Sequence, residues 1–397
     1  MNKIDKLKQR VIENVDIIHN DLIQIADLIF VNPETAFEEY KSSALLANAL
    51  EEEGFSVRRG IAGLKTSFVA SLNGKTESPR IAFLAEYDAL PQLGHACGHN
   101  LIGTSAVGAA LAIKSILTEL NGSVHVIGSP AEEGGGGKAI MVEAGVFELI
   151  DAALMVHPST HNTTRRGSLS SCKITLEFFG KSAHAAAAPE KGINAFDALI
   201  LAFTGINALR QHLRSDARVH GIITHGGEAT NIVPEYSAAK FGVRAMDVPY
   251  TRQIIDKVKA CAEAGALVTG ARLKFTEGQY HYAPMCPNPV LADLVDSNMR
   301  KLGIDVKFPI PNKGGMGSTD MGNVSQAVPA LHPYIAIGPE TVSTHTNEFR
   351  ELAGSAAGHV GMIKAAKIMS MTAIDLLACP EILTAVKTAF IQEPLNE

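Results

Sequence analysis

The residues best suited to chemistry lie in the segment His95-Ala96-Cys97-Gly98-His99. Because Cys97 and His99 are two positions apart, an extended loop points both side chains the same way. A thiolate and an imidazole together suit zinc or a similar divalent cation. Two other interpretations stay open: a tight glycine turn around a buried cysteine, and a thiol hydrolase with Cys97 as nucleophile and His99 as base. Metal binding is favoured over the thiol hydrolase, because partners so close in sequence rarely face each other.

A second cluster consists of Glu132 and Glu133, which follow the apolar run Ser123–Ser129 and precede four glycines. Two adjacent carboxylates repel each other unless a cation or a shared proton lies between them. One metal ligand and one general base is therefore a natural division of roles. A solvated acidic loop is the alternative. A phosphate loop is set aside, because GGGGK lacks the GxxxxGK[ST] spacing.

Two histidines also follow apolar runs: His157 comes after Ala152–Val156, and His345 comes shortly after Tyr334–Gly338. A single histidine at the end of a strand is more often structural than a ligand, but two at equivalent positions favour ligation. The candidate ligands are Cys97, His99, Glu133, His157 and His345. Five are too many for one tetrahedral zinc with an open position and suit two cations that share a bridge.

Short apolar runs alternate with helical stretches around these clusters. This alternation predicts an α/β domain with a largely parallel sheet that positions them. The small, apolar stretch Leu101–Leu117 predicts a helix buried against the sheet. The expected strands are Ser67–Leu72, Arg80–Ala85, Ser123–Ser129 and Ala152–Val156. Ligands bind beyond the carboxyl ends of strands in such sheets, so we expect the clusters to converge.

The pattern changes from about Ser171, where strands and helices follow in the order β-α-β-β-α-β. The helices are expected near Asn194–Leu213 and Thr251–Leu267. This order predicts a ferredoxin-like α+β domain at 171–283, inserted into an α/β domain made of 1–170 and 284–397. A long helix is expected over Ala356–Leu377 near the end of the chain.

Composition excludes several functional classes. The chain has 35 basic and 41 acidic side chains with no basic cluster, so nucleic acid is not an expected partner. The N-terminal segment alternates charged with apolar residues and lacks the apolar core of a signal peptide or membrane span, which predicts a cytoplasmic protein without membrane contact. The five cysteines form no CxxC pair, so neither a disulfide framework nor a zinc ribbon is predicted. Cys172, Cys261, Cys286 and Cys379 are expected to be inert thiols.

Six motifs occur in order over nearly the whole chain: LAEYDALPQLGHACGHN, GSPAEEGGGGKA, His157-Pro158, GKSAHA, TNIVPE and THTNEF. They resemble peptidase family M20, in the branch with indole-acetyl-amino-acid hydrolases, aminobenzoyl-glutamate hydrolase and β-alanyl dipeptidases. The resemblance implies a zinc-exopeptidase-like catalytic domain with a mixed, mostly parallel sheet, and an inserted lid domain that often mediates homodimer formation. It implies a metal-dependent amidohydrolase that cleaves a small N-acyl amino acid or dipeptide.

Carried over by position, the resemblance implies that the same five ligands hold two divalent cations, zinc or manganese, while Glu132 serves as general base and acid. It implies that His184, often from the neighbouring subunit, stabilises the oxyanion. Asn231 and Arg244 fall where substrate contacts are expected, although a surface salt bridge is an alternative for Arg244. Asp88 is a candidate for orienting a metal-bound imidazole.

One departure concerns Asn100, where the commonest form of this branch has aspartate. It favours the dipeptidase and aminobenzoyl-glutamate relatives over the indole-acetyl hydrolases. A competing hypothesis from another class is a non-catalytic binding protein that keeps the pocket for an amino-acid conjugate. The filled metal and base positions argue against it.

Overall fold

The structure, a computed structural model, describes residues 2–308 and 316–392. These residues form two compact units. The first unit comprises 2–167, 285–308, 316 and 320–392, and the second comprises 168–284 and 317–319. The second unit is therefore almost entirely one uninterrupted stretch of chain between two parts of the first.

The first unit is built on a six-stranded sheet in the order β1-β2-β4-β3-β5-β11. Strand β3 runs parallel to β4 and β5, and β5 runs parallel to β11, whereas β1, β2 and β4 pair antiparallel. The mixed, mostly parallel sheet is the predicted fold class, which is confirmed. The strands are β1 (Ser56–Arg59), β2 (Phe68–Asn73), β3 (Arg80–Ala85), β4 (Ser123–Gly128), β5 (Ala152–Leu154) and β11 (Ala330–Leu331).

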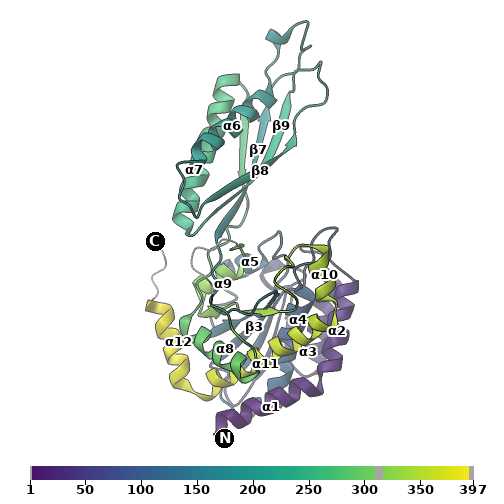
Figure 1. Ribbon diagram of the computed structural model, residues 1–397, viewed down its shortest axis with the longest axis vertical. Helices are drawn as coiled ribbons and strands as arrows, with labels where there is room; N and C mark the ends of the chain where they lie inside the picture. The colour runs from purple at the N-terminus through teal and green to yellow at the C-terminus, as the bar shows by residue number, and fades with distance from the viewer. Residues whose placement is uncertain (1, 309–315, 393–397) are drawn as a thin grey trace. The chain divides into compact units, whose positions relative to one another are not determined.

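Helices cover both faces of this sheet, which explains why β3 is a continuous apolar strand: Ile81, Ala82, Phe83 and Leu84 are all buried. Side chains of α1, α3, α4, α8, α11 and α12 pack on one face, and those of α5 and α9 on the other. Figure 1 shows β3 among these helices. They are α1 (Lys3–Ile17), α3 (Tyr40–Glu52), α4 (His99–Leu117), α5 (Gly137–Glu143), α8 (Pro289–Lys301), α9 (Met321–Ala327), α11 (Ala356–Ala378) and α12 (Pro380–Gln392).

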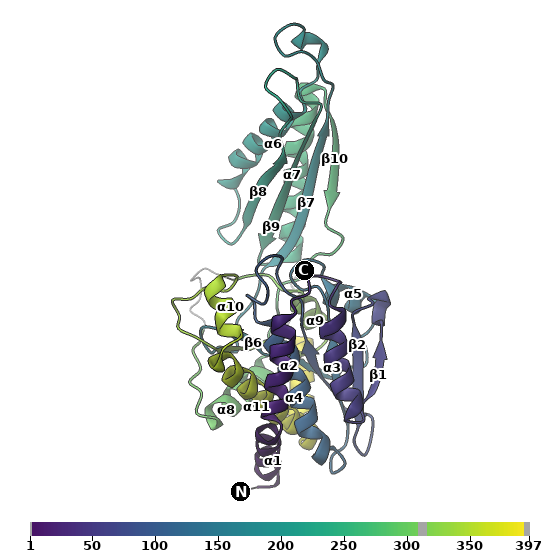
Figure 2. The same ribbon diagram turned by 90° about the vertical axis from the view of Figure 1, so that its right-hand side faces the viewer.

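Helix α4 is the predicted core helix. Its length and composition would suit a membrane span, but 83% of its apolar window is buried within the protein, as expected of a core helix. Helix α2 (His19–Val31) packs beside α4, and α10 (Asn347–Ala353) packs on α11. Figure 2 shows α2, α3 and α4 side by side.

A two-stranded parallel sheet lies apart from the main one and pairs β6 (His157–Ser159) with β12 (Tyr334–Ala336). The strand expected at Tyr334–Gly338 is therefore present, but outside the main sheet. His157 begins β6 rather than lying in a loop.

The second unit has the order β7-α6-β8-β9-α7-β10, with an antiparallel sheet β10-β7-β9-β8. This is the predicted ferredoxin-like arrangement. Alternate residues of β7, including Cys172 and Ile174, are buried in one core with residues of α6 and α7. Figure 1 shows both helices on one side of the sheet, and Figure 2 shows the strands face on. The elements are β7 (Ser170–Phe179), α6 (Ala195–Arg210), β8 (Arg218–His225), β9 (Tyr236–Ala245), α7 (Val248–Thr269) and β10 (Arg272–Glu277).

A buried polar network joins three helices of the first unit. Lys8 Nζ of α1 lies 2.6 Å from Asp375 Oδ1 of α11 and donates to Asn298 Oδ1 of α8 at 2.8 Å. Asn298 Nδ2 donates in turn to Asp375 Oδ2 at 3.1 Å. The side chains of Lys8 and Asp375 are each 8% exposed, so neither charge can turn to water without moving a helix.

We predict that Lys8→Met lowers the free energy of unfolding by about 3 to 5 kcal/mol, because it leaves Asp375 buried without its ammonium partner. Urea unfolding at fixed metal concentration measures this change. Lys6→Met, at an exposed position of the same helix, is the control. Equal stability of the two variants would contradict the prediction.

Candidate active site

The predicted clusters converge at the carboxyl ends of three neighbouring strands of the first unit. Cys97 and His99 follow β3, Glu132 and Glu133 follow β4, and His157 follows β5. Parallel strands end at the same edge of a sheet, so residues far apart in sequence meet there.

The first group consists of Cys97, His99 and His157, whose ligand atoms all lie within 4.8 Å of one another. His157 Nε2 is 3.4 Å from Cys97 Sγ, and His157 Nδ1 is 2.6 Å from the carbonyl oxygen of Pro158. A proton on Nδ1 satisfies that carbonyl and leaves the lone pair of Nε2 directed at the thiol. This is the usual arrangement of a metal-binding histidine.

Asp88 orients the other histidine, as predicted for a residue behind a metal ligand. His99 Nδ1 lies 2.9 Å from Asp88 Oδ1, and the backbone N–H of Glu133 donates to Asp88 Oδ2 at 2.9 Å. Burial alone would raise the pKa of Asp88, but the neighbouring His99 holds it below its ordinary value. Asp88 therefore remains an acceptor that joins the loops after β3 and β4.

The second group consists of Cys97, Glu133 and His345, again within 4.8 Å. Glu133 Oε1 lies 3.3 Å from His345 Nε2. Cys97 belongs to both groups, so it could serve as a ligand in each. The structure thus brings all five predicted ligands together.

Two buried polar atoms without hydrogen bonds in the described part of the chain support the binding of divalent cations at this site. His99 Nε2 and Glu133 Oε1 are buried and make no hydrogen bond to any described residue. Each lies just beyond hydrogen-bonding geometry from another titratable side chain: His99 Nε2 is 3.4 Å from Glu86 Oε2, and Glu133 Oε1 is 3.3 Å from His345 Nε2. Buried polar atoms without partners are costly, and a cation would satisfy both of them.

Burial, together with the carboxylate of Glu133, raises the pKa of the Cys97 thiol well above its usual range. Without a cation this thiol is protonated and therefore a poor nucleophile. The environment thus favours a metal ligand over the nucleophile of a thiol hydrolase.

Three carboxylates, those of Glu86, Glu132 and Asp320, also lie within 4.8 Å of one another. The buried Lys138 Nζ is 2.5 Å from Glu86 Oε1 and 2.6 Å from Asp320 Oδ1. Burial and then the neighbouring carboxylates of Glu86, Glu133 and Asp320 raise the pKa of Glu132 well above its usual range. A raised pKa makes this carboxylate a stronger base than a free glutamate, which suits a general base that later returns the proton.

Sequence reasoning missed Lys138 and Asp320 as members of the site, and it placed Glu86 in the first polar cluster without giving it a role. Lys138 was considered only as part of a phosphate loop, because its partners Glu86 and Asp320 are distant in sequence. Nothing local marks Asp320, because its partner is 182 positions away.

The loop before Glu132 is held by Glu39, a fully buried residue that the sequence analysis also missed. Glu39 Oε1 accepts from the backbone N–H of Ala131 at 2.9 Å, and Oε2 accepts from Thr66 Oγ1 at 2.8 Å. Ala131 has a φ of 61°, a left-handed value that is strained for alanine. His345 shares this strain with a φ of 64°, and its backbone N–H donates to Ala96 O at 2.9 Å. Such strain is concentrated at functional sites, where the surroundings hold it in place.

At two positions near the site only glycine fits, because a neighbouring residue lies too close for a Cβ atom. Gly98 has a φ of 81°, and a Cβ there would lie 2.5 Å from Pro158 Cγ, next to His157. A Cβ on Gly137 would lie 1.9 Å from the carbonyl oxygen of Pro130. The first glycine lets the loop after β3 approach β6, and the second lets the chain turn closely after Glu132 and Glu133.

The other predicted site residues belong to the second unit. His184 is exposed, and its Nδ1 accepts from the backbone N–H groups of Ala186 and Ala187 at 3.2 and 3.1 Å. Asn231 is exposed, and its carbonyl oxygen accepts from Ala185 N at 3.0 Å. Arg244 lies on β9, and its Nε is buried without a hydrogen bond to any described residue. Their contacts with substrate stay predictions.

The structure gives Asn100 hydrogen bonds to the backbone and, among the described residues, none to the candidate ligands. Its side chain is buried and donates to the carbonyl oxygen of Ala353 at 3.1 Å. The amide thus ties α4 to the end of α10, which gives this asparagine a structural role. Its position does not by itself indicate a substrate.

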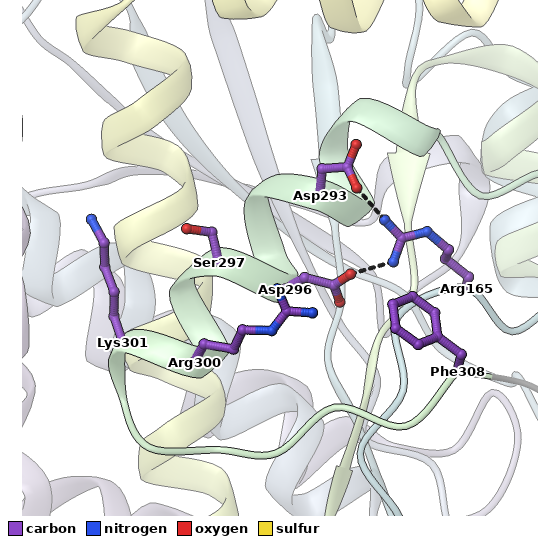
Figure 3. A pocket seen from close by; sticks show the side chains of 7 residues that line it. All are labelled: Arg165, Asp293, Asp296, Ser297, Arg300, Lys301 and Phe308. Carbon is purple, nitrogen blue, oxygen red and sulfur yellow. Dashed lines mark hydrogen bonds and ion pairs between the residues drawn. The ribbon is translucent and has the colours of Figure 1, made fainter.

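A separate hollow on the first unit is lined by charged side chains of α8 and by Arg165 and Phe308 (Figure 3). Arg165 pairs with both Asp293 and Asp296, so its guanidinium is already taken up by two carboxylates of α8. None of the grouped Cys, His and Glu residues lines this hollow.

Comparisons with known proteins find relatives over nearly the whole chain. The model of peptidase family M20/M25/M40 matches residues 82–359. A Xaa-Arg dipeptidase of Mus musculus is 37% identical over 98% of this chain and 93% of its own length. One of the subunits of the p-aminobenzoyl-glutamate hydrolase of Escherichia coli is 41% identical over 62% of this chain and 55% of its own length. The YXEP protein of Bacillus subtilis, described as a dinuclear metal binding peptidase, shares the fold with a TM-score of 0.68 at 21% identity, over 91% of this chain and 99% of its own.

We predict that Glu39→Leu lowers kcat/KM about tenfold or more while metal content stays unchanged. The substitution leaves the buried N–H of Ala131 without its acceptor, which costs about 1 to 3 kcal/mol. The loop would then hold Glu132 less precisely, and the rate would fall. Burial raises the pKa of Glu39 to about 7, so Glu39→Gln resembles the protonated form and should restore most activity.

Steady-state kinetics with metal analysis tests this, with the exposed Glu38→Gln as control. Near-normal kinetics of Glu39→Leu would show that Glu39 does not position Glu132.

Proposed function

The chain belongs to peptidase family M20/M25/M40, and from this premise we propose that it cleaves a small N-acyl amino acid or a dipeptide with the help of two divalent cations. The chain is a metal-dependent hydrolase of amide bonds. The proposal concerns its substrate, its cations and the roles of its residues. The observation that carries it is the position of Cys97 in two groups of ligand atoms at once. The comparisons give no support to a non-catalytic binding protein.

Cys97, His99 and His157 would hold one cation, and Cys97, Glu133 and His345 would hold the other. When bound, the cations would polarise the amide carbonyl and make a water molecule more acidic. The histidines and the carboxylate suit zinc or manganese, and the thiolate favours zinc.

Glu132 would take the proton from the attacking water and deliver it to the leaving amine. Its raised pKa supports this role, because a carboxylate with a raised pKa takes up a proton more readily than a free glutamate does. The ammonium of Lys138 fixes Glu86 and Asp320 beside it, so the negative field that raises this pKa is built into the fold.

We propose that the second unit serves as a lid and dimerisation domain, 171–283. His184 Nδ1 accepts two backbone N–H groups, so the ring proton lies on Nε2, where it could donate to an oxyanion of the same or a neighbouring subunit. Arg244 and Asn231 would contact the substrate carboxylate and amide. A surface salt bridge would need a carboxylate partner, and Arg244 Nε has no acceptor among the described residues.

The proposed homodimer has support in β8, an edge strand that exposes Ile222 and Ile223. Apolar residues on an exposed edge strand favour pairing with another strand. We predict a dimer, or a larger assembly of dimers, that Ile222→Lys weakens. Sedimentation velocity measures this, and a wild-type monomer at micromolar concentration would contradict it.

The names of the relatives suggest which substrates to test first: dipeptides with a C-terminal arginine, and p-aminobenzoyl-glutamate. We propose a cytoplasmic location. The five cysteines support it, because no disulfide joins any of them in the described part of the chain and oxidising compartments favour disulfides.

We predict that Glu132→Gln lowers kcat by at least about a hundredfold, because general acid and base catalysis contributes factors of about 10² to 10⁴. Bound metal should stay at the wild-type level, since Glu132 is not a proposed ligand. Amine release from these substrates, with metal analysis, measures both quantities. Near-normal turnover of the variant would show that the proton-transfer role is wrong.

A further inference from the structure

A second cluster of metal-ligating side chains lies in the second unit, apart from the site described above. It consists of Cys172 on β7, Glu277 at the end of β10 and His281 just beyond it. His281 Nε2 lies 3.3 Å from Cys172 Sγ and 3.3 Å from Glu277 Oε2. All three ligand atoms lie within 4.8 Å of one another.

The strand register explains this convergence. Glu277 pairs with Ile174 of β7, and a separate bridge pairs Tyr282 with Ser171. Four residues lie between Glu277 and Tyr282, whereas two lie between Ser171 and Ile174, so the chain beyond β10 bulges. The bulge places His281 opposite Cys172, on the same face of the sheet as the side chain of Glu277.

The distances match those between ligands of one tetrahedral zinc. With Zn–S near 2.3 Å and Zn–N or Zn–O near 2.0 Å, the tetrahedral edges are about 3.5 Å from sulfur to nitrogen and about 3.3 Å from nitrogen to oxygen. We propose that Cys172, Glu277 and His281 bind one divalent cation of the zinc class. Cys172 is 1% exposed, while the side chain of Glu277 is 38% exposed, so the cation would enter beside Glu277 and take water as its fourth ligand.

A reactive thiol explains the cluster less well. A Cys-His-acid relay uses both ring nitrogens of the histidine, but here the same Nε2 faces both the sulfur and the carboxylate. Burial raises the pKa of Cys172 to about 11, so the thiol alone is no nucleophile. The expectation that Cys172 is an inert thiol stays a prediction, which this proposal replaces with a role in metal binding.

One cation of the protein competes for this position. Arg252 Nη1 of α7 lies 3.3 Å from Glu277 Oε2, and its side chain is 56% exposed. Arg252 can therefore turn into water when a metal ion binds. A bound ion would fasten the segment after β10 to β7, close to where the chain returns to the first unit.

The test is a count of metal ions on the full chain, by mass spectrometry after gel filtration in zinc-containing and then metal-free buffer. We expect Cys172→Ser to hold one zinc fewer than the wild type, and zinc to raise its melting temperature less. Cys261→Ser, another cysteine of the second unit and only partly buried, should match the wild type. An equal zinc count in Cys172→Ser and the wild type would overturn the proposal.

Cys172 is buried, so its substitution could also disturb folding. Glu277 is exposed, and Glu277→Gln should lose one zinc without that risk. In addition, Cys97→Ser loaded with cobalt should keep a cobalt–thiolate absorption band that Cys97→Ser/Cys172→Ser lacks. Absence of the band from Cys97→Ser would also count against the site. Because no outcome depends on turnover, failure here is distinguishable from failure of the proposed amidohydrolase function.

Discussion

Negative charge gathered inside the first unit is the constraint on which the rest of the site depends. Glu86, Glu132 and Asp320 lie within 4.8 Å of one another, and the described ammonium among them is that of Lys138. Buried charges are costly unless they are paired, so protons or cations must supply what this lysine does not. The raised pKa of Glu132 is one response, and a pair of cations beside Glu133 would be the other. A general base and a metal centre thus follow from the same electrostatic requirement.

Holding such groups together requires a rigid frame, and the structure provides it with buried hydrogen bonds and small residues. Asp88 links His99 to the backbone of Glu133, and Glu39 links Thr66 to Ala131. Gly98 allows the loop that carries Cys97 to touch Pro158. These contacts involve residues that support the ligands and are not ligands themselves. They fix the positions of the ligand side chains before any cation binds.

The sequence was most informative where its signals are local. Strand β3 has the predicted bounds Arg80–Ala85, because a strand buried on both faces is a continuous apolar run. The ferredoxin-like order was readable because alternation in β7 and β9 contrasts with the helical stretches. Strands β6 and β11 were missed because two or three residues carry no period. Glu39, Lys138 and Asp320 were missed because their partners are distant in sequence, and the cluster at Cys172 depends on a bulge that no motif marks.

The measurement that tests the central claim most directly is the rate of amine release by one enzyme preparation before chelation, after chelation, and after zinc or manganese is returned. The account predicts loss of activity when the metal is removed and recovery when it is restored, with Cys97 never covalently modified by substrate. Full activity in a preparation shown to be free of metal, abolished by alkylation of Cys97, would contradict it and establish a thiol hydrolase instead.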